Sequence, residues 1–315
     1  MERLDRIPPR DGYGKALLRL VETDERIVVL DADVAKSTRT EWIKTAKPKR
    51  FIDMGISEQD MVGTAAGLAL SGMIPFATTY SVFLAGRAWD QIRTTVLYSG
   101  CNVKLAGAHA GINVGPDGAT HQAMEDAGIM RGLPGMTVVV PCDAIETEKA
   151  TMAIAALNGP AFIRFGREAM PVVTSEDTEF ELGKARLVSE GDDVVIFANG
   201  PMVYEAMESG QELLKGGIHA MIVDVHTIKP LDCECIVNAA RKTGAVVTAE
   251  DHQDIGGLGS AVCECLSGEY PVPVIRVGLH NTFGESGQAG ELMEKYGISK
   301  SHIISAVKRA LELKR

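Results

Sequence analysis

The residues with the clearest chemical potential lie in one polar loop at 108–122, which reads AHAGINVGPDGATHQ. His109 follows an apolar segment, and Asp117, Thr120 and His121 lie further along the same loop. Imidazole and carboxylate groups that converge can move protons to and from hydroxyl groups at neutral pH. The glycines of the loop permit backbone shapes that other residues resist. The loop therefore predicts a proton-transfer site, and a structural loop or a His-Asp-His metal site stay open as alternatives.

Three further loops place polar residues directly after apolar segments, at 30–37, 53–59 and 79–83. In a doubly wound sheet, ligands bind beyond the carboxyl ends of the strands, so we expect these loops to meet loop 108–122 at one sheet edge. Ser57 and Asp60 are three residues apart and predict a capping box for a helix that ends near residue 70.

Short apolar segments alternate with helical patterns along the chain. The first series of strands is predicted at 27–30, 75–80, 103–106 and 137–140, with helices such as 12–22, 85–97 and 144–156 between them. A polar, acidic stretch at 174–181 precedes a second series at 193–198, 220–225, 244–249 and 272–277. Strands that are apolar on both faces are typical of sheets covered by helices. The sequence predicts an α/β protein with two parallel or mixed sheet domains, each with helices on both faces.

The charge balance limits the classes of ligand. The 315 residues include 32 basic and 42 acidic side chains, which gives a formal net charge of -10. A protein that binds nucleic acid regardless of sequence needs a basic surface, so we expect no nucleic-acid partner. An anionic ligand must be held by a few individually placed basic side chains.

Membrane insertion and secretion are not expected. The stretch 61–86 has no charged residue and is long enough for a bilayer, but Pro75 and the pair Ser71-Gly72 interrupt it. The N-terminal residues MERLDRIPPRDGYG include no apolar segment, so we expect a reducing, cytoplasmic setting.

Two Cys-Glu-Cys triplets, at 233–235 and 263–265, resemble a paired metal motif. Their cysteines are two residues apart, and side chains at that spacing diverge on a helix. We interpret these cysteines as small buried apolar residues and assign no metal site to the chain.

Several sequence blocks together resemble the transketolase family. They are GISEQDMVGTAAGLALSGMIPFATTYSVF, GPDGATHQ, GLPGMTVVVPCDAIE, TIKPLD and FGESG, and they span nearly the whole chain. The resemblance implies a thiamine diphosphate pyrimidine-binding domain at 1–175 and a transketolase C-terminal domain at 190–315. The family's diphosphate-binding domain has no counterpart, since the chain lacks a Gly-Asp-Gly motif.

The resemblance implies that thiamine diphosphate binds between this chain and an N-terminal transketolase subunit, which would hold the diphosphate and a Mg²⁺ or Ca²⁺ ion. Glu58 matches the glutamate that shares a proton with ring nitrogen N1′ of the aminopyrimidine. Tyr80 and Phe83 match aromatic residues that stack on this ring. Asp33 matches an acidic residue near the cofactor, with Asp31 as a rival. Gly86 departs from the aromatic residue of many transketolases and resembles the deoxyxylulose-phosphate synthase branch.

The resemblance also implies a substrate site for sugar phosphates. The positions that match the phosphate-binding set are Arg10, Ser37, His109 and Arg167, and those that match residues on the ketose hydroxyls are Asp117 and His121. The expected catalytic residues are Glu58, His109 and His121. The implied reaction transfers a two-carbon ketol unit from a ketose phosphate to an aldose phosphate, as in the pentose phosphate pathway.

The resemblance implies one subunit of a split transketolase, active with its N-terminal partner in a heterotetramer of two of each chain, or a homodimer when alone. Three alternatives are a deoxyxylulose-phosphate synthase-like subunit, a 2-oxo acid dehydrogenase β-like subunit and a non-catalytic scaffold. The loop GPDGATHQ argues against the dehydrogenase β subunit. The combination of Glu58, Tyr80 and Phe83 with the loop histidines argues against a scaffold.

The second half of the chain shows no spacing typical of a site. Its polar loop residues His226, Asp232, Asp251 and His252 come from separate predicted strands. We interpret them as surface residues, and the second domain as an interface and packing element.

Overall fold

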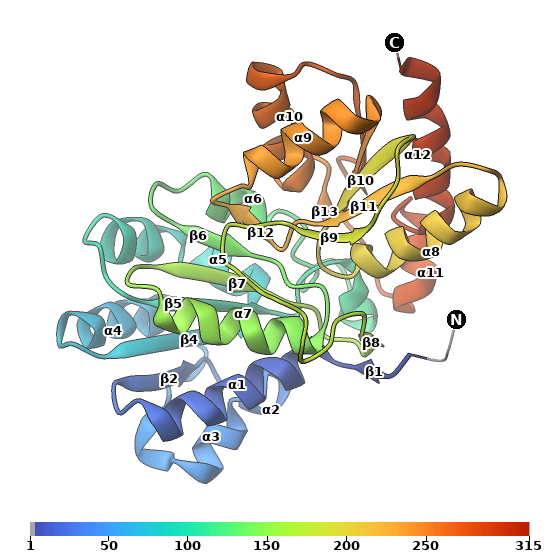
Figure 1. The fold of residues 1–315 in the computed structure, drawn as a ribbon. Helices are drawn as coiled ribbons and strands as arrows, with labels where there is room; N and C mark the ends of the chain where they lie inside the picture. Colours follow the sequence, from blue (N-terminus) through green and yellow to red (C-terminus); the bar gives the residue numbers. More distant parts are fainter. Residues whose placement is uncertain (1–3, 315) are drawn as a thin grey trace.

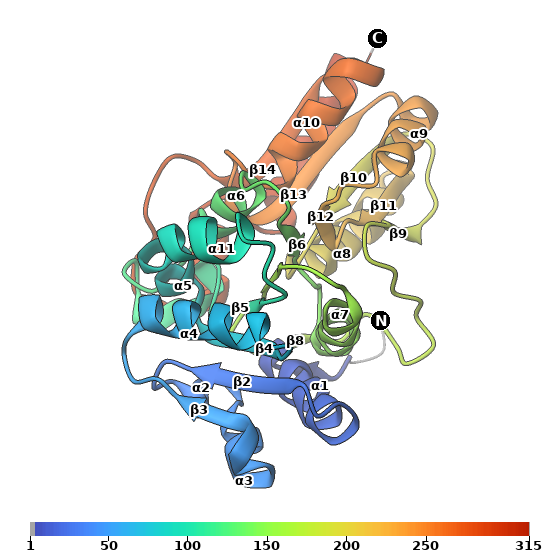
Figure 2. The same cartoon turned by 90° about the vertical axis from the view of Figure 1, so that its left-hand side faces the viewer.

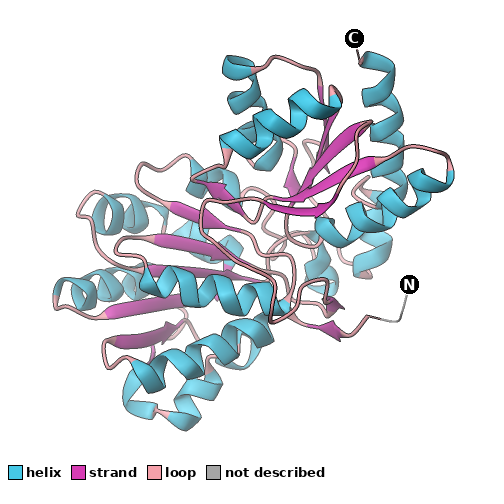
Figure 3. Cartoon of the chain, viewed as in Figure 1, coloured by secondary structure: helices cyan, strands magenta, loops and turns pink. Residues whose placement is uncertain are grey.

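The computed structural model describes residues 4–314. Two sheets lie side by side (Figure 1). Apart from its edge strand at 227–229, the first is drawn from blue to green, and the strands of the second are drawn from yellow to orange. Helices flank both sheets, as the cyan and magenta elements of Figure 3 show. The predicted α/β class, with two mostly parallel sheets, is confirmed.

The first sheet has the strand order β12-β6-β7-β5-β4-β2-β3, in which β12 is antiparallel to β6 and the other pairs are parallel. Its strands are β2 (Ile27–Asp31), β3 (Phe51–Asp53), β4 (Ile74–Tyr80), β5 (Lys104–Ala108), β6 (Thr137–Val139), β7 (Ala161–Arg164) and β12 (Thr227–Lys229). Every residue of β2, β5 and β7 is buried. These strands are buried on both faces because helices cover the sheet from both sides.

Two helical layers cover the first sheet. One contains α1 (Pro9–Thr23), α3 (Glu41–Ala46) and α7 (Ala144–Ala156), and the other contains α4 (Glu58–Leu70), α5 (Ser81–Arg87) and the π-helical segment η2 (Gln91–Leu97). The connecting segments are α2 (Ala35–Thr38), η1 (Pro48–Arg50), the 3-10 segment η3 (Ile112–Asp117) and α6 (Asp126–Arg131). Tyr13 and Phe76 pack in the first layer, and Met61 and Leu105 pack in the second.

Two local predictions in this domain differ from the structure. The helix predicted at 85–97 consists of α5 and η2, with a break after Arg87. Ser57 does occupy the N-cap of α4, but its side chain accepts no capping bond within the described chain; its hydroxyl instead donates to the Met54 carbonyl at 3.4 Å. The capping-box prediction is therefore wrong, although the helix begins and ends where expected.

The second sheet has the order β14-β13-β10-β11-β9, with β9 antiparallel to β11. Its strands are β9 (Arg186–Ser189), β10 (Val194–Ala198), β11 (Ala220–Asp224), β13 (Val246–Gln253) and β14 (Val274–Leu279). The helices α8 (Met202–Lys215) and α12 (Lys300–Leu313) cover one face, α9 (Cys233–Thr243) and α10 (Leu258–Glu269) cover the other, and α11 (Ala289–Lys295) packs near η3. A small antiparallel pair joins β1 (Arg6–Ile7) to β8 (Met170–Pro171).

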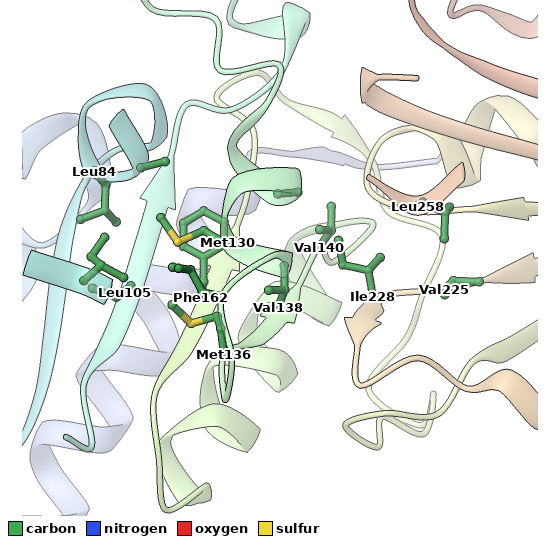
Figure 4. Close-up of a cluster of buried hydrophobic side chains, with 14 of the residues drawn as sticks. Leu84, Leu105, Met130, Met136, Val138, Val140, Phe162, Val225, Ile228 and Leu258 are labelled. Atoms are coloured by element: carbon green, nitrogen blue, oxygen red, sulfur yellow. The ribbon is translucent and has the colours of Figure 1, made fainter. Parts of the chain in front are cut away.

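The two halves of the chain share structure across the predicted boundary between 175 and 190. Strand β12, from the second half, pairs with the edge of the first sheet, and Figure 2 shows it beside β6. An apolar cluster continues from Leu105 and Phe162 in the first domain to Ile228 and Leu258 in the second (Figure 4). The domain boundaries at 175 and 190 stay a prediction. The first sheet and the apolar cluster both include residues from each side of these boundaries.

The Cys-Glu-Cys cysteines are not buried. Cys233 is exposed, and Cys235, Cys263 and Cys265 are partly exposed, so the prediction that they are buried small residues is wrong. Across residues 4–314, no helix has the length and apolar character needed to cross a membrane.

Candidate active site

The carboxyl ends of β2, β4, β5 and β7 meet at one edge of the first sheet. Tyr80 at the end of β4 is paired with Ala108 at the end of β5, so Tyr80 and His109 leave adjacent strands at the same level. This register explains why the polar loops 31–37, 79–83 and 108–122 converge, as the sequence predicts.

Four rings form the centre of the site. The rings of Tyr80 and His109 are stacked at 4.2 Å with an interplanar angle of 18°, and Tyr80 lies 6.1 Å from Phe83. The ring of His121 meets Phe83 edge-on at 5.2 Å and Tyr80 at 6.0 Å. The structure thus brings together two predicted cofactor residues and two predicted catalytic residues in one aromatic cluster.

His109 is held in an unusual environment. Its side chain is buried and its backbone has a φ of 55°, in the left-handed region that few residues other than glycine adopt. Burial, together with the nearby Arg10, Arg167 and Arg39, lowers the pKa of His109 to about 3. The buried Nδ1 has no hydrogen-bond partner among residues 4–314. His109 therefore presents a neutral ring with one unused polar atom, rather than a cation.

Three arginines surround this histidine. Arg10, at the start of α1, donates to the Ser37 carbonyl at 3.0 Å, and its buried Nε has no partner within the described residues. Burial lowers the pKa of Arg10, and the positive charges of Arg39 and Arg167 lower it further. Cations that crowd together in this way favour a bound anion, because an anion would relieve their mutual repulsion.

Ser37 lies within the same cluster, in the short helix α2, where its carbonyl accepts the Arg10 bond. Arg39 follows α2 with a φ of 70° and donates to Asp11 at 2.7 Å. Sequence reasoning missed Arg39, because its contribution depends on the turn after α2 and not on any motif.

Asp117 and Arg167 form an ion pair. Arg167 donates to the Asp117 carboxylate at 3.1 Å and to the Val114 carbonyl at 3.2 Å. His121 shares a hydrogen bond of 2.9 Å with the Thr120 hydroxyl, in which the tautomer decides the donor. The predicted hydroxyl-contacting residues thus border the predicted anion-binding arginines.

Glu58 is the first residue of α4 and is 4% exposed. Its Oε1 accepts a hydrogen bond of 3.1 Å from Arg87, whose guanidinium group lies 4.1 Å above the Phe83 ring. The carboxylate is therefore connected to the aromatic cluster through Arg87. Arg87 was also missed by sequence analysis, since the pairing depends on how α5 packs against α4.

Asp31 and Asp33 have different environments. Asp31 is buried, and its carboxylate accepts bonds from the Val34 N–H at 2.7 Å and from the Thr38 and Thr40 hydroxyls at 2.8 Å each. Burial raises the pKa of Asp31 to about 6. Asp33 is exposed, with a φ of 63°. Asp31 therefore shapes the loop that carries Ser37, while the role of Asp33 near a cofactor stays a prediction.

Three side chains of metal-ligand type, Cys142, Glu146 and Asp224, lie within 4.8 Å of one another between the domains. Arg186 donates to Asp224 at 2.9 Å, so a cation already neutralises this cluster. Burial and the adjacent Asp224 raise the pKa of Glu146 well above its ordinary range. We interpret this cluster as an interdomain ion pair.

The second-half residues interpreted as surface residues are buried in part. His226, Asp251 and His252 are each 1–2% exposed, so that interpretation is wrong for them. Asp232 caps α9 by accepting from the Cys235 N–H at 3.1 Å. The sequence could not show this burial, because it arises from contact between the two domains.

The donor set fits the aminopyrimidine of thiamine diphosphate. A flat heteroaromatic ring can stack on Tyr80 or Phe83. The nearly buried Glu58 carboxylate can bind a ring nitrogen, and the unpartnered Nδ1 of His109 offers a further hydrogen bond.

Comparison with known proteins gives the same family over both halves. Residues 5–172 match Transketolase, pyrimidine binding domain, and residues 183–303 match Transketolase, C-terminal domain. The chain is 45% identical over 305 residues to the 6-deoxy-6-sulfo-D-fructose transketolase subunit of Clostridium sp. (strain MSTE9), covering 97% of this chain and 95% of that protein. It is 38% identical over 304 residues to an apulose-4-phosphate transketolase subunit of Phocaeicola vulgatus, covering 96% of each.

A solved structure described as a split gene transketolase, inactive beta4 tetramer, superimposes with a TM-score of 0.92 at 50% identity. The match covers 98% of this chain and 100% of that one. The relatives support ketol transfer of the transketolase type and do not favour the pyruvate-using or scaffold alternatives. Over both halves, this chain belongs to the transketolase family.

Proposed function

We propose that this chain is the C-terminal subunit of a two-chain, thiamine diphosphate-dependent transketolase that acts on sugars with an anionic end group. The observation that carries the proposal is the juxtaposition of the Tyr80, Phe83, His109 and His121 rings with Arg10 and Arg167. The names of the relatives as transketolase subunits support a partner chain. The partner would supply the diphosphate site and its Mg²⁺ or Ca²⁺ ion, in a heterotetramer of two of each chain.

Each residue has a distinct part in the proposed mechanism. The bound cofactor would supply the nucleophilic carbon and the electron sink that ketol transfer needs. Glu58 would hold the proton at the aminopyrimidine nitrogen, and Arg87 would fix the carboxylate through its hydrogen bond to Oε1. Tyr80 and Phe83 would orient the ring and exclude water from it.

The sugar would be held at both ends. Arg10 and Arg167 would bind the terminal anion, and His109, as a neutral ring, would donate or accept a hydrogen bond at a sugar hydroxyl. His121 and Asp117 would contact the remaining hydroxyls and move protons to and from them. Arg167 would have to exchange its present bond to Asp117 for the anion, which leaves Asp117 free for a hydroxyl.

The end group is proposed to be a phosphate ester, and the sulfonate named for the Clostridium protein is the competing chemistry. Both groups are tetrahedral anions, but a phosphate monoester carries the larger charge at neutral pH and gains more from three converging arginines. Because the chain has a net charge of -10, this local cation cluster is the feature that selects such substrates.

The test uses the chain mixed with its N-terminal partner, thiamine diphosphate and Mg²⁺. Ketol transfer to an aldose phosphate is measured with three donors: a ketose phosphate, the same ketose without phosphate, and a 6-sulfonated ketose. The expected order of kcat/KM is phosphate, then sulfonate, then the neutral sugar. Preference for the sulfonated donor would overturn the end-group assignment, and absence of transfer from every donor would overturn the proposed function.

A matched pair of variants isolates the anion site. Arg167→Gln should raise KM for the phosphorylated donor by about tenfold or more, and leave KM for the neutral ketose unchanged. Arg19→Gln is the control, because Arg19 also forms an ion pair, with Glu148, but lies towards the other end of α1 from Arg10. Equal effects of Arg167→Gln on both donors would contradict a role at the anion.

A further inference from the structure

The second domain reaches into loop 108–122 through Asp251, near the end of β13. Asp251 is 1% exposed, and its Oδ1 accepts a hydrogen bond of 2.8 Å from the Ile112 N–H, at the start of η3. A Cβ on Gly111 would lie 1.9 Å from Asp251 Oδ2, so only glycine allows this approach, and its φ of 86° also suits glycine. The carboxylate thus fills the space beside the backbone that leads from His109 to Asp117.

A buried arginine fixes the backbone of Asp251 from the other side. Arg164, at the end of β7, donates to the Asp251 carbonyl at 2.7 Å and to both carboxylate oxygens of Asp126 at 2.9 Å. Asp126 in turn accepts a bond of 2.5 Å from the hydroxyl of Ser81, the residue after Tyr80. The wall of the aromatic cluster and the polar loop are therefore connected through one residue of the second domain.

The far end of the loop is held by the second domain as well. Gln122 donates to the Glu285 carbonyl at 2.9 Å, and a Cβ on Gly118 would lie 2.5 Å from the Ser286 hydroxyl oxygen. Contacts at Ile112 and at Gln122 therefore bracket the segment that carries Asp117 and ends at His121.

We propose that Asp251 is a positioning residue for ketol transfer, which sets the path of loop 108–122 and so the placement of His109, Asp117 and His121 against the substrate. Asp251 contacts the backbone of the loop at Ile112 and is not among the residues proposed to bind the cofactor or the sugar. The inference rests on the proposed function, and it gives the C-terminal domain a part in the active site in place of the packing role expected from the sequence. Loss of the carboxylate acts on substrate binding and leaves the pyrimidine pocket in place.

The kinetic test compares two neighbouring acids in the holoenzyme assembled with the partner subunit. Asp251→Ala should raise KM for the ketose donor about tenfold, with the dissociation constant of thiamine diphosphate unchanged. Asp251→Asn keeps an oxygen acceptor for Ile112 and should restore most of the loss. Glu250→Ala is the matched control, because Glu250 is equally buried in β13 but caps α10 by accepting from the Leu258 and Gly259 N–H groups. A KM change of the same size in Glu250→Ala, or none in Asp251→Ala, would overturn the proposal.

A second measurement does not depend on the reaction. Amide hydrogen exchange of residues 109–122 should be faster in Asp251→Ala than in the wild type, close to the wild type in Asp251→Asn, and unchanged in Glu250→Ala. Gly111→Ala should lower the urea midpoint strongly in the wild-type chain and clearly less in an Asp251→Ala background, since the clash is then removed while the strain at positive φ stays the same. If Gly111→Ala lowered the urea midpoint equally in both backgrounds, the proposed contact between Gly111 and Asp251 would be refuted. These readouts still decide the positioning role if no donor supports ketol transfer, so the two proposals fail separately.

Discussion

The ring of His109 is expected to stay neutral throughout the pH range in which the enzyme can work. Burial and three nearby arginines lower its pKa from 6.5 to about 3. At about 1.4 kcal/mol per pKa unit, this difference amounts to about 5 kcal/mol against the imidazolium form. The perturbation that tests the cause is Arg167→Gln, which removes one of the three charges and should raise the pKa while burial keeps it below 6.5.

The assay is NMR of histidine labelled at the ring carbons, titrated from about pH 8 to about pH 4.5. The resonance of His109 is assigned by its loss in His109→Gln. It should not move with pH in the wild type, whereas an exposed ring titrates near its ordinary pKa. Arg19→Gln is again the control, because it removes an arginine charge away from the cluster.

The same shift has a consequence for stability. The folded-state pKa lies below the unfolded value, so the contribution of His109 to the free energy of unfolding is fully present above about pH 6.5 and is lost as the pH falls towards 3. A wild-type titration midpoint between about 6 and 7 would refute the reasoning, since it would mean that water or an anion reaches the ring. A His109 resonance that moves no more towards pH 4.5 in Arg167→Gln than in the wild type would refute the part assigned to that arginine.

Three further predictions concern Glu58, which is proposed to bind the cofactor, the buried Asp31, and the packing of a helix at Gly12. Glu58→Gln should lower kcat for ketol transfer by about 100-fold or more with little change in melting temperature, because it removes an acid–base group; near wild-type kcat in the holoenzyme would contradict this role. Burial raises the folded-state pKa of Asp31 to about 6, so its contribution to stability is present below pH 3.8 and is lost as the pH rises through about 6. Asp31→Asn should remove a difference of about 2.5 kcal/mol between the free energies of unfolding at about pH 4 and pH 7, measured with urea; an equal difference in both proteins would count against it. Gly12→Ala should destabilise the chain by about 1–3 kcal/mol, because its Cβ would lie 1.9 Å from the Ala144 carbonyl oxygen. Gly63→Ala, in α4 with open space around it, should instead stabilise by up to about 1 kcal/mol, and equal melting temperatures for the two variants would contradict the packing argument.

Elements with a strong local pattern could be predicted from the sequence. Helix α7 could be predicted at the residues where it lies, 144–156, because its residues follow a helical pattern. The structure adds that Asp143 caps this helix. Strand β12 could not be predicted, since its three residues become a strand only by pairing with β6, about ninety residues earlier. The break between α5 and η2 also lacks a proline or any other local signal.

The candidate site likewise includes contacts that the sequence could predict and contacts that it could not. Tyr80 and His109 could be placed together because both follow strands of one parallel sheet, where carboxyl ends share an edge. The bond between Arg87 and Glu58 could not, because it depends on how two helices pack. Asp251 was misread as a surface residue because its burial comes from the other domain.

Strand β12 also bears on how the chain can be divided. If the first domain were produced alone, by cutting the chain in the acidic stretch at 174–181, β6 would become an unprotected edge with free backbone N–H and C=O groups. Val138 would lose the cover of Ile228 and be exposed with it. The two halves are therefore not modules that could be exchanged between enzymes at this boundary, and a chimaera must carry residues 227–229 along with the first sheet to remain monodisperse.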